Sequence, residues 1–393
     1  MKSFAVVLVC YNRIAGIKRL LKSLEKVDFD GRKDIHLIFS IDHSGSETVL
    51  NFANVYQWPY GEKHVRYFSS RQGLKKHILQ CGDFTQQFDI VAILEDDLYL
   101  SDSFYHYSYQ ASEFYWDDDN IAGISLYSFQ KNWLDWFIRF EPQQSSYDTY
   151  FLKIAMSWGQ IWLPHKWKLF MEWYKCNEIF EKGENIPQYL NTWPESSWLK
   201  YHDRYCIETN RYFVYPYVSI STNFSDAGEH AKIGVTDHQV ELMYGKHQYL
   251  FPLFSPDAVI YDEYMEREGL EKYVGLNKGE LTVDYYGTKK ENIWKRYLIS
   301  TNSYNYKIIK SYALSLRPIE LSIINDIGGE GIYLYDTQQS VHNRKFDGDY
   351  NRKLFSIRSH SSREILRFSI KLYVRDQSAR IKAYLNKMFK ARH

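Results

Sequence analysis

The sequence is poor in cysteine, glycine and proline. Its 393 residues include only four cysteines, and none of them are paired at a metal-binding spacing, so neither a zinc ribbon nor a disulfide framework is expected. The scarcity of cysteine favours a reducing compartment. Twenty glycines and nine prolines exclude collagen-like and long low-complexity tracts. The four cysteines are Cys10, Cys81, Cys176 and Cys206.

Long apolar runs and an excess of one charge are also lacking. No stretch approaches the roughly 20 apolar residues that span a bilayer, and Met1-Lys2-Ser3 leads directly into a short apolar run rather than a signal peptide. The 49 basic residues nearly balance 48 acidic ones, so the chain as a whole lacks the excess positive charge typical of nucleic-acid-binding proteins. We therefore expect a cytoplasmic protein with no nucleic-acid partner, whose contact with a membrane is peripheral.

Short apolar runs alternate with helical patterns over the first 125 residues. The helical spacing of Ile17, Leu20 and Leu24 follows the first run, and similar patterns separate the later ones. This alternation predicts an α/β fold with a mostly parallel sheet flanked by helices. Ligands of such sheets bind beyond the carboxyl ends of the strands. The predicted strands cover residues 5–10, 35–41, 65–68, 90–94 and 121–125.

The periodic pattern weakens in the second half of the chain. We divide the sequence into a sheet domain over residues 1–255, an extension of unassigned type over 256–360, and a basic helical tail over 361–393. Six tryptophans cluster between residues 158 and 198, where most are expected in the core and one or two could stack on a sugar ring. They are Trp158, Trp162, Trp167, Trp173, Trp193 and Trp198.

Three adjacent carboxylates, Glu95-Asp96-Asp97, follow directly on the apolar run 90–94; we call them the acidic triplet. Because like charges repel, a folded protein tolerates such a triplet best where a cation or sugar hydroxyls compensate it. Carboxylate oxygens suit Mg²⁺ or Mn²⁺, and such an ion can neutralise a departing diphosphate. The alternative is a solvated loop or a helix N-terminus, where acidic residues are also favoured.

Two further polar residues end the first two predicted strands. Asp42 could accept a hydrogen bond from a nucleobase ring N–H, or it could cap the helix that begins near Glu47. Arg13, in Cys10-Tyr11-Asn12-Arg13, could reach a phosphate, or it could be an ordinary surface arginine.

Together these elements resemble the inverting GT-A glycosyltransferases, both family 2-like bacterial enzymes and the animal N-acetylglucosaminyltransferase I family. The likeness rests on Val9-Cys10-Tyr11-Asn12-Arg13, on Ile41-Asp42-His43-Ser44-Gly45 and on the acidic triplet with Leu98. It continues through segments 101–104, 157–162 and 206–211, and covers residues 4–235.

The resemblance implies a UDP-sugar donor, an Mn²⁺ or Mg²⁺ cofactor and a role for each matched residue. Asp97 would ligate the metal, Asp96 would hold the ribose or the donor sugar, and Glu95 would bind donor-sugar hydroxyls. Asp42 would read uracil, and Arg13 would contact the diphosphate.

The catalytic base departs from the family pattern. The resembled enzymes carry it in an Asp-Asp-Trp element, whereas this chain has Pro194-Glu195-Ser196-Ser197-Trp198. An inverting transferase needs a carboxylate near the attacking hydroxyl. Glu195 is the first candidate and Asp203 the second, and either could instead be a helix-surface acid.

A polar segment, Asn223-Phe224-Ser225-Asp226-Ala227-Gly228-Glu229-His230, follows a predicted strand that begins at Tyr212. In related enzymes a loop at this place folds over the diphosphate. The resemblance therefore implies that His230 ligates the metal or touches phosphate, and the alternative is a plain loop histidine.

The last 31 residues are basic and predicted to be helical. Between Arg363 and His393 nine basic and two acidic residues give a charge of +7, and apolar residues such as Leu366, Ile370 and Leu385 recur at near-helical spacing. A basic amphipathic helix fits an anionic membrane surface. The alternative is a packed C-terminal helix with a solvated basic face.

These observations predict a metal-dependent, inverting glycosyltransferase on the inner face of the cell membrane. Its acceptor would be a glycan. Inference at the level of the fold points to a lipid-linked oligosaccharide in bacterial surface-polysaccharide synthesis. One rival is a non-catalytic protein that binds a nucleotide sugar or glycan on the same scaffold. The other is a nucleotidyltransferase or phosphatase, which would need a glycine-rich phosphate loop that does not follow Cys10.

Overall fold

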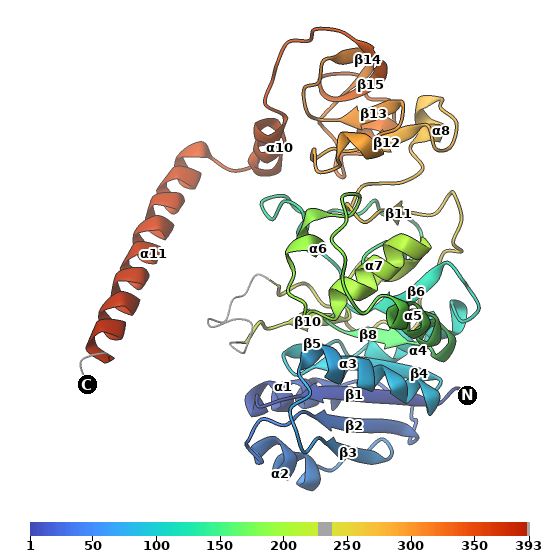
Figure 1. Cartoon of the computed structure of the whole chain (residues 1–393), viewed down its shortest axis with the longest axis vertical. Coiled ribbons are helices and arrows are strands. Elements are labelled where there is room, and N and C mark those ends of the chain that lie inside the picture. Colours follow the sequence, from blue (N-terminus) through green and yellow to red (C-terminus); the bar gives the residue numbers. More distant parts are fainter. Residues whose placement is uncertain (227–237, 391–393) are drawn as a thin grey trace.

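The computed structural model describes residues 1–226 and 238–390. These residues form an α/β body, a smaller β-rich C-terminal unit, and a long helix, α11 (Ser362–Lys390), that stands apart from both (Figure 1). The predicted mostly parallel sheet flanked by helices is confirmed.

A nine-stranded sheet forms the centre of the body, in the order β11-β7-β9-β6-β8-β4-β1-β2-β3. Strands β1 to β4 run parallel, whereas β8 runs antiparallel to β4 and β7 antiparallel to β9. The strands are β1 (Phe4–Cys10), β2 (Ile35–Ile41), β3 (Lys63–Tyr67), β4 (Ile90–Glu95), β6 (Ile121–Ser125), β7 (Thr149–Leu152), β8 (Gln160–Trp162), β9 (Tyr212–Pro216) and β11 (Ile260–Tyr261).

The central strand β1 is apolar throughout because helices cover both faces of the sheet. Phe4, Val6 and Leu8 belong to one core cluster, whereas Ala5 and Val7 belong to the other. Helices α1 (Ile14–Leu24), α2 (Thr48–Val55) and α4 (Phe104–Phe114) pack on the first face. Helices α3 (Leu74–Gly82), α5 (Pro164–Cys176) and α7 (Leu199–Thr209) pack on the second. Two short elements, η1 (Asp83–Gln86) and α6 (Gln188–Thr192), complete the helices of the body.

A small antiparallel pair crosses the carboxyl edge of the sheet. Strand β5 (Leu98–Leu100) begins directly after the acidic triplet and pairs with β10 (Ser221–Asn223). In this register Asn223 lies opposite Leu98, so the pairing brings a segment from late in the body beside the triplet.

The C-terminal unit is a four-stranded sheet in the order β12-β13-β15-β14, with a core cluster of its own that includes Leu270. The predicted domain boundary at 255 falls ahead of β11, which still pairs with β7 of the body. The elements are α8 (Glu271–Val274), β12 (Leu281–Val283), η2 (Glu291–Ile293), β13 (Tyr297–Ser300), β14 (Tyr306–Ala313), α9 (Leu321–Ile324), β15 (Gly331–Ser340) and α10 (Gly348–Ile357).

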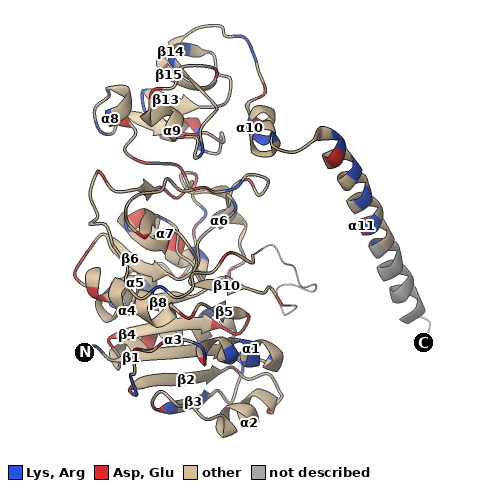
Figure 2. Ribbon diagram, turned by 180° about the vertical axis from the view of Figure 1, so that it is seen from behind, with Lys and Arg blue, Asp and Glu red and all other residues tan. Residues whose placement is uncertain are grey.

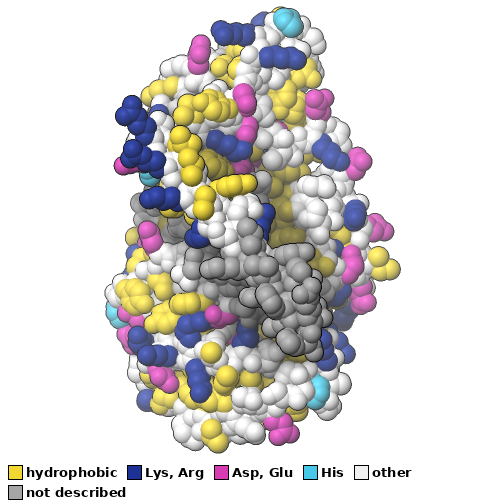
Figure 3. Space-filling view, turned by 90° about the vertical axis from the view of Figure 1, so that its left-hand side faces the viewer, with side chains coloured by type: hydrophobic (Ala, Val, Ile, Leu, Met, Phe, Trp, Pro, Cys, Tyr) yellow, Lys and Arg dark blue, Asp and Glu magenta, His cyan; other side chains and the backbone are white. Residues whose placement is uncertain are grey.

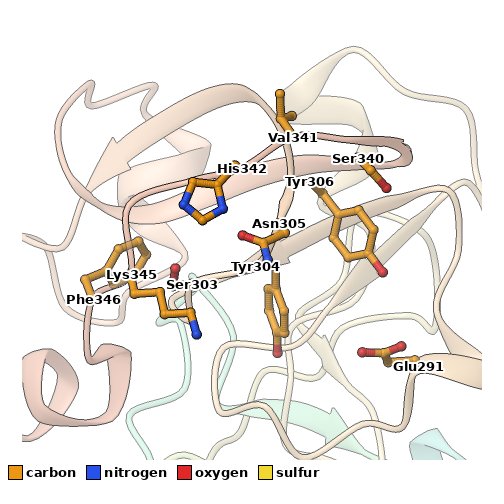
Figure 4. Close-up of a pocket in the computed structure, with 10 residues that line it drawn as sticks. All are labelled: Glu291, Ser303, Tyr304, Asn305, Tyr306, Ser340, Val341, His342, Lys345 and Phe346. Carbon is orange, nitrogen blue, oxygen red and sulfur yellow. The ribbon is translucent and has the colours of Figure 1, made fainter.

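An open hollow of about 780 Å³ lies on the C-terminal unit. The aromatic side chains of Tyr304, Tyr306 and Phe346 line it together with polar ones such as His342 (Figure 4). Its lining residues all belong to the C-terminal unit, so this hollow is separate from the cavity at the acidic triplet.

Basic residues recur along the described part of helix α11, which extends away from the body (Figure 2). Basic and hydrophobic side chains lie side by side on the face of the molecule seen in Figure 3. Leu366, Ile370 and Tyr373 are each more than half exposed. Phe368 is exposed as well, and it lies about 200° around the helix from Leu366. The apolar side chains in this part of α11 are therefore not confined to the single stripe expected from the sequence. Within the described residues, no helix is long and apolar enough to cross a membrane.

Candidate functional site

The carboxyl ends of β1, β2 and β4 open into one cavity of about 340 Å³. Because Cys10 lies in register with Ile41, and Val9 with Glu95, the residues that follow the three strands meet at one edge. The structure thereby brings Arg13, Asp42 and the acidic triplet into one lining.

Arg13 compensates the acidic triplet. Its Nη1 donates to Asp97 Oδ2 at 3.2 Å, and its Nη2 donates to Asp96 Oδ1. Burial disfavours the charged guanidinium, but the charges of Asp96 and Asp97 outweigh this effect and raise the pKa of Arg13. Arg13 is therefore not the surface arginine of the alternative interpretation, and its hydrogen bonds go first to the carboxylates.

The triplet retains more negative charge than Arg13 can neutralise. Burial, followed by the charges of Asp97 and Asp96, raises the pKa of Glu95 to about 8, so its carboxyl is mostly protonated at neutral pH. Burial also raises the pKa of Asp96 to about 6, although Arg13 opposes this. A divalent cation bound here would stabilise the ionised carboxylates.

Asp97 is the member of the triplet best placed to hold such an ion. Its side chain is 13% exposed, against 4% for that of Asp96, and its Oδ1 accepts a hydrogen bond from Asn223 Nδ2 at 3.3 Å. Carboxylate and amide oxygens are the ligands of Mg²⁺ and Mn²⁺, which take few protein ligands where phosphate oxygens complete the shell. The residues present thus fit the predicted metal.

Helix α1 approaches the triplet so closely that a side chain at Gly16 has no room. A Cβ built on Gly16 would lie 2.3 Å from the carbonyl oxygen of Asp96. The absence of a side chain thus lets α1 pack directly on the backbone that carries the carboxylates.

We expect Gly16→Ala to lower the free energy of unfolding by about 1–3 kcal/mol, the usual cost of overpacking. Without a clash, replacing glycine by alanine inside a helix would stabilise the protein by about 0.5–1 kcal/mol. The expected net loss of stability therefore comes from the clash. Thermal unfolding followed by circular dichroism measures the change. Gly328→Ala is the matched control, because a Cβ there meets nothing within 4 Å. Equal stability of Gly16→Ala and wild type would contradict the close approach.

Asp42 organises the loop that precedes α3. Its Oδ1 accepts hydrogen bonds from the backbone N–H groups of His43 and Gln72 at 2.8 and 2.7 Å, and its Oδ2 accepts one from Gly73 at 2.9 Å. A carboxylate has about four acceptor positions, so one remains on Oδ2 for a ligand N–H. Capping of α2, the alternative interpretation, is wrong, because the hydrogen bonds of Asp42 go to His43, Gln72 and Gly73 instead of to the N-terminus of that helix.

Below Asp42 the cavity has a polar floor that the sequence analysis missed. His77 lies 2.6 Å from Ser40 Oγ through its Nε2, and Arg66 donates to the same hydroxyl. Burial lowers the pKa of His77 to about 4, so its ring is neutral. A single histidine within a helical pattern carries no sequence feature that could have identified it.

The segment after β10 contributes to the opposite wall. Asp226 lines the cavity and forms an ion pair with Arg19, while its backbone oxygen accepts a hydrogen bond from Arg13 Nη1 at 3.3 Å. His238 also lines the cavity, with its ring centroid 4.4 Å from that of Trp158. His230, the predicted metal ligand, lies outside the described residues.

Neither of the two candidate bases lines the cavity. Glu195 is 70% exposed, pairs with Lys200 Nζ at 3.2 Å and accepts from Tyr201 Oη at 3.0 Å. These hydrogen bonds lower the pKa of Glu195. Lys75 Nζ donates to the same Tyr201 hydroxyl at 3.4 Å, and its neighbour Leu74 lines the cavity. The lowered pKa keeps Glu195 ionised, and its side chain faces solvent.

Asp203 is fully buried in α7 and ties this helix to the preceding segment. Its Oδ1 accepts from the backbone N–H of Ala155 at 2.6 Å, and burial raises its pKa well above the usual range. A carboxyl that is buried inside the body and bonded to the backbone holds α7 in place and is out of reach of an acceptor hydroxyl.

Aromatic side chains extend from the cavity along the body. Trp158 is in the lining, and its ring packs edge-on against Trp133, which also contacts Trp136. Trp136 is 46% exposed, so this row reaches solvent. Of the six tryptophans expected mostly in the core, Trp162, Trp167 and Trp198 are buried, and the other three are partly buried against it.

No protein-family model matches this chain, and no curated protein does. Among solved structures it is similar to S. aureus TarS 1–349, at 17% identity over 55% of this chain and 58% of that one, with a TM-score of 0.33. The same protein in complex with UDP-GlcNAc matches at 14% identity over 65% and 63% of the two chains, with a TM-score of 0.32. The mannosyltransferase PcManGT from Pyrobaculum calidifontis, in complex with GDP-Man and Mn²⁺, matches at 13% identity over 55% and 57%, with a TM-score of 0.34.

Each of these matches spans less than two thirds of the neighbour's chain. Similarity at this level does not by itself define an activity. The predicted likeness to the N-acetylglucosaminyltransferase I family stays a prediction.

Proposed function

We propose that the protein is a metal-dependent glycosyltransferase of the GT-A type that uses a UDP-sugar. One observation carries the proposal. Asp42, Arg13 and the acidic triplet come from three strand ends far apart in the sequence, and the parallel register gathers them around one cavity. A strand-edge cavity with an acceptor for a nucleobase and hard oxygen ligands for a metal suits a nucleoside diphosphate.

In this proposal each residue has a distinct task. Asp42 offers its remaining acceptor position to the uracil N–H, and Glu95 faces the hydroxyls of the donor sugar. Asp97 holds Mn²⁺ or Mg²⁺, which when bound neutralises the diphosphate of the leaving UDP. Asp96 is buried against Arg13, so we assign this pair to positioning Asp97 rather than to contact with the ribose.

The reaction is a single displacement with inversion. An acceptor hydroxyl attacks the anomeric carbon, the bond from that carbon to the diphosphate oxygen breaks, UDP leaves, and the hydroxyl proton passes to a carboxylate. Glu195 is the proposed proton acceptor because it is ionised and exposed to solvent. The aromatic row that starts at Trp158 would stack on a glycan acceptor, such as a lipid-linked oligosaccharide.

Glu195→Gln should slow transfer by about 10²–10⁴-fold, because the amide keeps the size of the side chain but cannot take the proton. The affinity for UDP should be unchanged, since Glu195 does not line the cavity. Steady-state transfer rates, with Glu172→Gln on α5 as the control, measure the effect. A rate within about threefold of wild type would exclude Glu195 as the base.

A non-catalytic sugar-binding protein remains the second candidate, on one specific observation. Neither Glu195 nor Asp203 lines the cavity, and Ser196 and Ser197 stand where the resembled enzymes have aspartates. Such a protein would bind UDP-sugars without breaking them.

Product analysis with a panel of nucleotide sugars tests the function. The protein with Mn²⁺ is incubated with UDP-GlcNAc, UDP-glucose, UDP-galactose or GDP-mannose, with and without glycan acceptors. We expect UDP from at least one donor, and loss of the reaction in EDTA. Binding without UDP release would favour the non-catalytic candidate. UMP as the first product would indicate cleavage within the diphosphate and contradict glycosyl transfer.

We further propose that α11 holds the protein on an anionic membrane. The support is its basic charge together with the exposed apolar side chains at Leu366, Phe368 and Ile370. Each basic residue near such a surface contributes about 1 kcal/mol.

Truncation before Arg363 should therefore release the protein from anionic vesicles in a co-sedimentation assay. Binding of the full chain should weaken with salt, because charges are screened within about 8 Å at physiological ionic strength. Part of it should resist salt, through the apolar side chains. The truncated protein should still release UDP, since the described cavity residues all precede residue 239. Equal pelleting of the two forms would show that α11 does not bind the membrane.

A further inference from the structure

A second cluster of ligating side chains lies outside the donor cavity, where the segment around residue 247 crosses α4. It joins Asp28 from the loop after α1, His106 from α4, and His247. His106 Nε2 lies 2.9 Å from His247 Nδ1, and Asp28 Oδ2 lies 3.2 Å from each of these nitrogens. The three atoms thus form a nearly equilateral triangle.

No choice of histidine tautomers satisfies all three contacts of this triangle with linear hydrogen bonds. The Asp28 oxygen is an acceptor, so each histidine nitrogen would have to carry a proton to bond to it. The two nitrogens would then face each other proton to proton at 2.9 Å. If either nitrogen is unprotonated, its lone pair faces the carboxylate instead. A cation at the centre removes the conflict, because all three atoms then act as electron-pair donors.

We propose that Asp28, His106 and His247 bind a transition metal ion of the Zn²⁺ type. Two imidazole nitrogens and a carboxylate oxygen are common zinc ligands, and a fourth position would remain for water. In a tetrahedral zinc site with bonds of about 2.0–2.1 Å, the ligand atoms lie about 3.4 Å apart. The atoms here need to separate by only a few tenths of an ångström.

The surrounding hydrogen bonds hold the ligands in place. The backbone N–H of Asp30 donates to Asp28 Oδ1 at 2.9 Å, which leaves Oδ2 directed to the histidines. Gln110, one turn along α4 from His106, donates to the backbone oxygen of His247 at 2.7 Å and accepts from the N–H of Tyr249 at 3.1 Å. Such second-sphere contacts orient metal ligands.

The ion would clamp the 243–251 segment to α4. This segment follows His238 of the donor cavity, and it is also fixed by the hydrogen bonds of Gly245 N to Asp102 and Lys246 N to Ser103. The proposed ion is structural and separate from the hard-ligand site at Asp97, because none of its three ligands lines the cavity.

A similar group in the body provides a matched control. His36 lies on β2, Glu62 in the turn before β3 and His64 on β3, with contacts of 3.3, 3.5 and 3.8 Å between the ligating atoms. The carboxylate of this group is 73% exposed, against 48% for Asp28, so water competes with an ion more strongly at Glu62.

The test is a titration of the full chain with Co²⁺ and then Zn²⁺, after chelator treatment and without nucleotide. We expect one Co²⁺ per chain with visible absorption bands, displacement of Co²⁺ by Zn²⁺, and a higher melting temperature with Zn²⁺. His247→Ala and Asp28→Asn should each weaken Zn²⁺ binding by at least about tenfold, since even outer-sphere partners cost 10–100-fold. Both side chains are about half exposed, so these variants should fold.

Asp97→Asn and His64→Ala should leave the Co²⁺ spectrum and the Zn²⁺ affinity unchanged. Absence of Co²⁺ absorption, unchanged Zn²⁺ affinity in His247→Ala, or loss of binding in His64→Ala alone would each overturn the proposal. The last result would assign the ion to the control cluster.

Discussion

Asp97→Asn is expected to abolish metal-dependent sugar transfer while the fold persists. The substitution keeps the size of the side chain but removes the charge that would hold the ion under the diphosphate. The rate of UDP release should fall by at least about 10²-fold, the scale of loss when one electrostatic group at the reaction centre is removed. Steady-state UDP release in saturating Mn²⁺ measures this.

The stability of the variant separates a lost metal from a lost fold. Because the Asp97 carboxylate repels that of Asp96, and Arg13 keeps its bond to Asp96, we expect the melting temperature to stay the same or rise. Glu113→Gln is the control: this residue lies on the surface of α4, where its ion pair with Lys2 contributes little. Full activity of Asp97→Asn, together with resistance to EDTA, would refute the metal assignment.

Asp42→Ala should weaken donor binding. It leaves the backbone N–H groups of His43, Gln72 and Gly73 without their acceptor, and each unsatisfied buried group costs about 1–3 kcal/mol unless the loop opens to water. It also removes the proposed uracil contact. We expect UDP affinity to fall more than about tenfold, which corresponds to 1.4 kcal/mol.

The control for Asp42 is Glu47→Ala, because Glu47 is exposed and its side chain caps no helix. Comparison of UDP with Mn²⁺-pyrophosphate separates the two contributions of Asp42. A loss confined to UDP would locate the effect at the base, and equal losses would locate it in the loop. Unchanged affinity for both ligands would contradict any role of Asp42 in the site.

The sheet and the meeting point of the site residues were predictable from the sequence. The run from Phe4 to Cys10 is apolar at every position, which in a short segment requires cover on both faces. Parallel strands then place their carboxyl ends at one edge, so Asp42 and the acidic triplet had to converge whatever the details of the loops.

The partners of those residues were not predictable, because they depend on tertiary contacts. The hydrogen bonds of Asp42 reach a loop 30 residues away, and nothing at Gln72 or Gly73 indicates this. Asp203 has the sequence context of an exposed helical acid, and only the packing of α7 buries it. The triangle of Asp28, His106 and His247 joins residues 78 and 141 positions apart, without a motif at any of them.

The C-terminal unit escaped assignment because its core is small. Strand β14 exposes Lys307, Ile308 and Ile309 in succession, so the usual alternation of apolar and polar residues is lost. Only the pairing with β15, whose inner residues Ile332 and Leu334 are buried, defines the sheet.

Calorimetric titration of the full chain with UDP, with Mn²⁺ and with EDTA, tests the central claim most directly. If the acidic triplet and Asp42 form a metal-dependent nucleotide site, UDP binds at one site per chain in Mn²⁺, and EDTA weakens it at least about tenfold. Asp97→Asn then binds UDP in Mn²⁺ no better than wild type does in EDTA. UDP affinity that is the same in Mn²⁺, in EDTA and in Asp97→Asn, or no binding of UDP at all, would contradict the account.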